Sequence, residues 1–147
     1  MRIYTGIYTW LAVYVDDEAN KDSEEWQNFV PRFYSQEEQH NTLARGWDYH
    51  LRLCHRYFSQ KAANFIITAS LSFTNVNALA GCEVPRMART AGFDGSTWAK
   101  FMRIKDGVGE VYGWFTFPKA LYPDMSQFME AVPDIESYVD IVNDILS

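Results

Sequence analysis

The chain has 147 residues, of which 48% are hydrophobic and 16% aromatic, and its formal net charge is −6. This length allows one domain with a substantial core. The acidic balance argues against a nucleic-acid partner and against a polybasic membrane anchor. The high aromatic share suits an apolar pocket as well as a dense core.

The apolar start, MRIYTGIYTWLAVYVDD, lacks the charged leader and the small-residue cleavage site of a signal peptide. No apolar run approaches the ~20 residues that a membrane span needs. Cys54 and Cys82 are the two cysteines of the sequence, and we interpret them as free thiols in a reducing compartment. We therefore expect a cytoplasmic protein without a membrane partner.

Hydrophobic periodicity predicts helices along nearly the whole chain. In order, the expected helices span residues 2–17, 24–33, 42–58, 60–79, 98–117 and 133–147. Pro31 is expected to disturb the second of them. The helix over 60–79 is apolar on most sides, which places it near the centre of the fold. No series of strands is visible, so the predicted fold class is all-α.

The helix over 98–117 contains Gly107, Gly109 and Gly113. Each glycine costs about 1 kcal/mol relative to alanine in a helix, so this helix is expected to bend or open in the middle. Pro133 suits the first turn of the last helix, which reaches the final residue without a stop signal. A helix that ends in mid-pattern predicts one incomplete domain over 1–147, truncated at both ends.

Three short patterns carry candidate chemistry, and the first is VDDEANKD. If the first helix continues through it, Asp16 and Asn20 share a face with Ala12, Thr9 and Thr5. A face of small residues that leads to a carboxylate would line one wall of a cavity with an ion at its rim. The plain alternative is a solvated acidic helix end.

The second pattern is the closing VNDILS. Asn143 and Ser147 offer two neutral oxygens four residues apart on one helical face. A third donor one turn further would complete a grip on a hard cation such as Mg²⁺, which prefers oxygen ligands. The plain alternative is the polar stripe of an ordinary amphipathic helix.

The third pattern is Arg-x-x-Asp-Gly within FMRIKDGVGEVYGWF. Arg103 can bind a phosphate through two N–H groups, and Asp106 can hold its guanidinium in place. Gly107 lets the helix open and exposes a backbone carbonyl. The plain alternative is a surface ion pair beside a glycine required for packing.

The order of these three patterns resembles the class I terpene synthases, and most closely the fungal trichodiene synthase-like sesquiterpene synthases. VDDEANKD is similar to their aspartate-rich motif, and NDILS to the first five positions of their second metal motif. The resemblance includes the Gly-Cys of AGCE and the stretch MRIKDGVG. It covers roughly half of a typical catalytic domain of the family, and implies a partial class I terpenoid synthase helical bundle.

The resemblance implies a magnesium-dependent lyase that ionises and cyclises a linear prenyl diphosphate, farnesyl diphosphate by expectation, to a sesquiterpene. Three Mg²⁺ ions would stabilise the diphosphate as it leaves. By position in the motifs, Asp16 would coordinate magnesium with support from Asp17, and Asn143 and Ser147 would bind a further ion.

The same resemblance implies that Arg103 senses the diphosphate, that Asp106 is a linker, and that Gly107 turns its carbonyl towards the substrate. Aromatic faces can stabilise passing carbocations. Trp10, Phe73 and Trp114 are the main candidates for this role, and core packing is the plain alternative for each. Phe115 and Phe117 are further candidates.

Two departures from the family pattern concern the metal motifs. Asn20 stands where an acidic residue is usual, so that Glu18 or Asp22 would have to compensate. The glutamate that completes the second motif would fall four residues after Ser147. We therefore expect these 147 residues alone to be inactive and poorly soluble.

Two other functions stay open on the sequence. One is a non-catalytic helical module of the same fold that binds an isoprenoid or a partner protein. The other is a prenyl-chain elongating enzyme, which would carry a second Asp-Asp-x-x-Asp where NDILS stands. A homodimer is an allowed assembly in each case.

Overall fold

The computed structural model describes residues 1–19, 21–80 and 96–146. Within these ranges the chain is helical and contains no strand, which confirms the all-α prediction. The helices are α1 (Arg2–Ala19), α2 (Ser23–Ser35), α3 (Thr42–Arg52), α4 (Gln60–Ala80), α6 (Ser96–Asp106), α7 (Val108–Phe115) and α8 (Val132–Leu146), with 3₁₀ turns η1 (Leu53–Arg56), η2 (Met125–Gln127) and η3 (Met129–Ala131). The loop expected over 81–95 lies outside the described residues.

Two helix predictions need correction. The helix expected over 42–58 ends at Arg52 and tightens into the 3₁₀ turn η1. Pro31 was expected to disturb the second helix, yet α2 continues through it to Ser35. The buried side chains of Trp26 and Phe33 lie on either side of Pro31 along α2, so packing anchors the helix in spite of the missing N–H.

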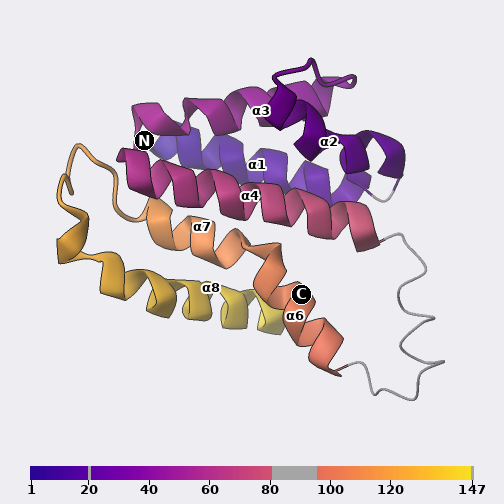
Figure 1. The fold of residues 1–147 in the computed structure, drawn as a ribbon. Helices are drawn as coiled ribbons and strands as arrows, with labels where there is room; N and C mark the ends of the chain where they lie inside the picture. The colour runs from indigo at the N-terminus through magenta and orange to yellow at the C-terminus, as the bar shows by residue number, and fades with distance from the viewer. Residues whose placement is uncertain (20, 81–95, 147) are drawn as a thin grey trace.

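Helix α4 lies at the centre of the molecule, as its apolar sequence predicts. It contacts α1, α2 and α3 as well as α6 and α7. Figure 1 shows α3 and α1 on one side of α4, and α7 on the other side with α8 packed beyond it. None of the described helices is both long and apolar enough to cross a membrane.

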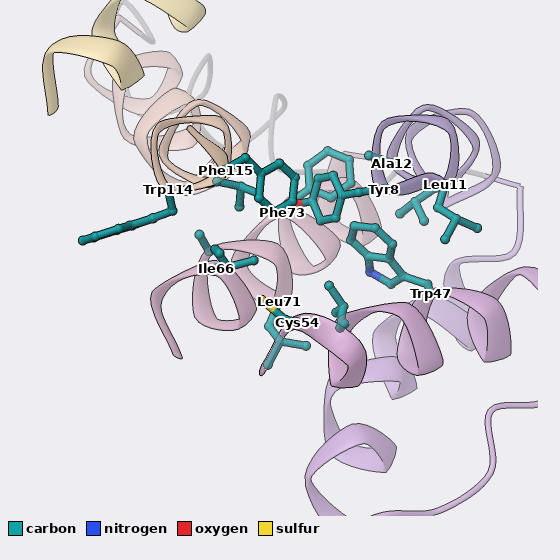
Figure 2. Close-up of a cluster of buried hydrophobic side chains, with 14 of the residues drawn as sticks. Tyr8, Leu11, Ala12, Trp47, Cys54, Ile66, Leu71, Phe73, Trp114 and Phe115 are labelled. Carbon is teal, nitrogen blue, oxygen red and sulfur yellow. The ribbon is translucent and has the colours of Figure 1, made fainter. Parts of the chain in front are cut away.

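Aromatic side chains from four helices meet in the core beside α4. Figure 2 shows Tyr8 of α1, Trp47 of α3, Phe73 of α4 and Phe115 of α7 converging on this cluster. The Tyr8 and Phe115 rings meet edge to face at 4.8 Å between centroids. Because α1, α3 and α7 each contribute a ring, this cluster fixes how they lie around α4.

The polar tips of the core aromatics find partners on α4. The Tyr8 hydroxyl lies 2.8 Å from Ser70 Oγ. The Trp47 indole N–H donates to Thr74 Oγ1 at 3.0 Å. Since an unpaired buried polar group is costly, these bonds specify the register of α1 and α3 against α4.

The predicted opening of the helix over 98–117 occurs at Gly107. This residue has φ = 67° and separates α6 from α7. A Cβ there would lie 2.8 Å from the carbonyl oxygen of Ala69 on α4. A left-handed conformation and a close backbone contact both require glycine at this position.

Candidate active site

A cavity of about 390 Å³ lies between the central helices and α8. Its lining residues come from α1, α4, α6, α7 and α8: Thr9, Ala12, Val13, Asp16, Phe73, Arg103, Asp106, Val108, Gly109, Tyr112, Val139, Asp140 and Asn143. A larger hollow of about 570 Å³ between α2, α4 and α6 contains none of the predicted site residues. The smaller cavity is therefore the candidate active site.

Helix α1 supplies the wall that the sequence predicts. Thr9, Ala12 and Asp16 line the cavity from one face of this helix, whereas Thr5 is not among the lining residues. Burial raises the pKa of Asp16, and the neighbouring charge of Asp17 adds to the shift. Asp17 is exposed and does not line the cavity. Asn20 lies outside the described residues.

Arg103 connects α6 to α8 at the cavity wall. Its Nη1 donates to Asp106 Oδ2 at 3.0 Å, which confirms the pairing expected from the i,i+3 spacing. Its Nη2 donates to the backbone carbonyl of Asp140 at 2.9 Å. The same Nη2 lies 3.4 Å from the Asp140 carboxylate and 3.1 Å from that of Asp144. The guanidinium is thus held by three carboxylates from two helices.

The electrostatic field at this wall is negative. Burial raises the pKa of Asp106 to about 6, Arg103 opposes this shift, and the charges of Asp140, Asp16 and Asp144 add to it. The Asp140 pKa is also raised, chiefly by burial. One guanidinium faces four carboxyl groups from α1, α6 and α8, so the site favours additional cations.

The donor atoms of the cavity suit magnesium. Asp16 on α1 and Asn143 on α8 both line it, and each offers oxygen. Mg²⁺ prefers oxygen ligands and usually keeps several waters, so that few protein groups suffice. In the part of the chain that the structure describes, no group of three or more His, Cys, Asp or Glu side chains is arranged to hold a metal ion. Ser147, the other predicted ligand on α8, lies outside that part.

The carbonyl oxygen of Gly107 was expected to be exposed, and the structure differs from this expectation. Its carbonyl oxygen accepts a hydrogen bond from the backbone N–H of Val111 at 3.1 Å. The break therefore does not leave this oxygen without a partner, because α7 begins at once after the left-handed turn. Asp106 and Val108, on either side of Gly107, line the cavity, whereas Gly107 itself does not.

The structure places one of the three main aromatic candidates in the cavity wall. Phe73 lines the cavity, but Trp10 and Trp114 do not. Trp10 is 57% exposed, since it follows Thr9 by one residue and is rotated about 100° around the helix axis. Trp114 is buried against the Phe65 ring, with 5.0 Å between centroids.

The remaining two aromatic candidates also lie outside the cavity lining. Phe115 belongs to the buried core, where it stacks on Phe58 at 5.4 Å between centroids. Phe117 stacks on Phe128 at 4.2 Å. Core packing is therefore what the structure shows for both rings.

Two polar residues of the cavity lining, Asp140 and Tyr112, were not predicted. Asp140 lies three residues before Asn143, a spacing that places both on one helical face and was a readable signal. Tyr112 carries no such local signal, because what brings it to the cavity is the break at Gly107, which redirects α7.

A family model described as trichodiene synthase (TRI5) matches residues 1–147, which is the whole chain. The chain belongs to the trichodiene synthase family. This confirms the family to which the three sequence patterns pointed.

Several members of fungal terpene synthase families are similar to this chain. Longiborneol synthase CLM1 of Gibberella zeae is 35% identical over 149 residues, which cover all of this chain and 44% of that protein. Terpene synthase BipA of Cochliobolus sativus is 30% identical over 148 residues, which cover 100% of this chain and 45% of that protein. (E)-beta farnesene synthase of Metarhizium brunneum is 26% identical over 153 residues, which cover 97% of this chain and 43% of that protein. The chain thus spans less than half the length of these curated relatives.

Proposed function

We propose that this chain forms part of a magnesium-dependent terpene cyclase, a carbon–oxygen lyase that ionises a linear prenyl diphosphate and releases diphosphate. Farnesyl diphosphate, which would give a sesquiterpene, is the preferred substrate. One observation carries the proposal: Asp16, Arg103 and Asn143, from three helices far apart in the sequence, line a single cavity. Membership of the trichodiene synthase family supports it.

The cavity residues divide the work between a polar and an apolar part. Asp16 and Asn143, with Ser147, would hold magnesium, which when bound supplies Lewis-acid stabilisation of the departing diphosphate. Arg103 would bind diphosphate oxygens, for which its planar set of N–H donors is suited. Asp106 orients the guanidinium of Arg103 through the 3.0 Å hydrogen bond.

The apolar part of the cavity would receive the prenyl chain. Ala12, Val13, Phe73, Val108 and Val139 line it. Side chains of this kind exclude water, which would otherwise quench an allylic cation. The ring of Phe73 can also stabilise positive charge through its face.

The alternative is a non-catalytic helical module that binds an isoprenoid or a protein partner. Two observations favour it. Asn20 replaces the usual acidic residue of the first motif. Arg103 is already paired with three carboxylates, and an incoming diphosphate would have to compete with them.

The deciding experiment uses the chain extended at both ends to the length of its relatives. It is incubated with farnesyl diphosphate and MgCl₂, and diphosphate release and volatile hydrocarbons are measured. We expect Asp16→Ala and Asn143→Ala each to reduce diphosphate release by roughly 100-fold. Asp134→Ala, an exposed carboxylate outside the cavity, is the matched control and should retain activity. Substrate binding without release, unaffected by Asp16→Ala, would support the non-catalytic module instead.

A further inference from the structure

The cavity wall contains a pair of hydroxyl groups that joins two helices, and the two residues are 103 positions apart in the sequence. Thr9 Oγ1 of α1 lies 2.7 Å from the phenol oxygen of Tyr112 on α7. Both residues line the cavity. The pair therefore lies on the wall formed where α1 meets α7.

Counting protons assigns the direction of this hydrogen bond. The Thr9 hydroxyl donates its single proton to the backbone carbonyl of Thr5 at 3.0 Å. It has no second proton for Tyr112, so Tyr112 must be the donor and Thr9 the acceptor. Among the described residues, no side chain or backbone group donates to the phenol oxygen of Tyr112, which leaves its lone pairs available.

The surrounding rings hold the phenol in place. The Tyr112 and Tyr8 ring centroids lie 6.3 Å apart, with an angle of 86° between the ring planes. For Tyr112 and Phe115 the distance is 5.9 Å and the angle 88°. Such edge-to-face contacts favour one ring orientation. Burial raises the pKa of Tyr112, so the hydroxyl stays protonated at neutral pH.

We propose that Tyr112 is a product-determining residue. Thr9 holds the phenol proton, so the phenol oxygen presents its lone pairs to the cavity. There they stabilise positive charge that develops on a prenyl chain. This inference rests on the function proposed above. The interaction is between a charge and a fixed dipole, and no bond to Tyr112 forms or breaks. Thr9 acts as a positioning residue, because without it the hydroxyl proton could turn towards the cavity and reverse the dipole.

The test compares product ratios in the extended chain with farnesyl diphosphate and MgCl₂. Tyr112→Phe removes the oxygen but keeps the ring, and Thr9→Val removes the acceptor while keeping the shape. We expect each variant to lower the share of the main hydrocarbon, per diphosphate released, by roughly threefold or more. Thr9→Ser keeps the hydroxyl and should restore the wild-type ratio.

Tyr8→Phe is the matched control. It also removes a phenol oxygen that bonds to a hydroxyl, but Tyr8 is fully buried and does not line the cavity. We expect it to lower stability and to leave the product ratio unchanged. A merely structural role for Tyr112 would make Tyr112→Phe behave like this control.

The outcomes separate the two proposals. If diphosphate is released but the product ratios of Tyr112→Phe and Thr9→Val equal that of the wild type, the role of Tyr112 is refuted and the cyclase proposal stands. If the wild type releases no diphosphate, both are refuted. A double-mutant cycle on thermal stability adds a readout without substrate, because a real Thr9–Tyr112 bond requires a coupling energy different from zero.

Discussion

Gly107 shows how one residue can set the direction of a helix. Its φ of 67° is the left-handed conformation, and a Cβ at this position would collide with the backbone of α4 at Ala69. Both features follow from the missing Cβ. The turn brings Asp106 on one side and Val108 on the other to the cavity wall.

We predict that Gly107→Ala lowers the free energy of unfolding by about 1–3 kcal/mol, because the new Cβ is strained at positive φ and approaches Ala69 O to 2.8 Å. The measurement is urea unfolding followed by tryptophan fluorescence at low protein concentration. Gly6→Ala is the control: no atom lies within 4 Å of a Cβ there, and it should gain about 0.5–1 kcal/mol in the helix interior. Equal stability of Gly107→Ala and wild type would contradict the turn.

At the scale of elements, α8 approaches α7 closely because two positions of α7 lack a side chain. A Cβ at Gly109 would overlap the carboxylate of Asp140, and one at Gly113 would come within 3.0 Å of Val132 Cγ1. The close approach allows Asp140 to reach Arg103. Packing between α7 and α8 and the ion pairs of the site therefore depend on the same contact.

We predict that Gly109→Ala destabilises the protein by about 1–3 kcal/mol through overpacking. The cost should shrink when Asp140→Ala is also present, since the shortened side chain relieves the overlap. Gly46→Ala is the control, because its Cβ would lie 3.7 Å from Leu11 Cδ2, an ordinary contact. Thermal unfolding of the four variants of this cycle measures the coupling, and strict additivity would argue against the contact.

At the scale of the molecule, the main feature is the excess of negative charge where α1, α6 and α8 meet. The pKa of Asp106 is raised to about 6 there, above its ordinary value of 3.8. For an acid, a higher pKa in the folded state means that ionisation opposes folding. This penalty is present at neutral pH and is relieved as the pH falls through about 6.

We therefore predict that wild type gains stability relative to Asp106→Asn, by about 1 kcal/mol, when the pH falls from 7.5 to 5.0. Asparagine cannot titrate, so it provides the reference for all other groups. Free energies of unfolding from urea titrations at the two pH values give the difference. A difference that does not change with pH would show that Asp106 keeps an ordinary pKa.

The sequence by itself determined what depends on near neighbours along the chain. Helix periodicity predicted most helix positions and the central place of α4, and glycine content predicted the opening at Gly107. The face of Thr9, Ala12 and Asp16 and the Arg103–Asp106 pair follow from spacings of three and four residues. Such spacings fix which side chains share a face, whatever the rest of the chain does.

The tertiary structure alone decided which faces meet. It brought Tyr112 to Thr9 and Asp140 to Arg103, left Trp10 exposed, and placed Trp114 beside Phe65 away from the cavity. These outcomes depend on how α7 turns after Gly107 and how closely α8 packs on it. A helical pattern encodes neither quantity locally, because both arise from contacts between residues far apart in the sequence.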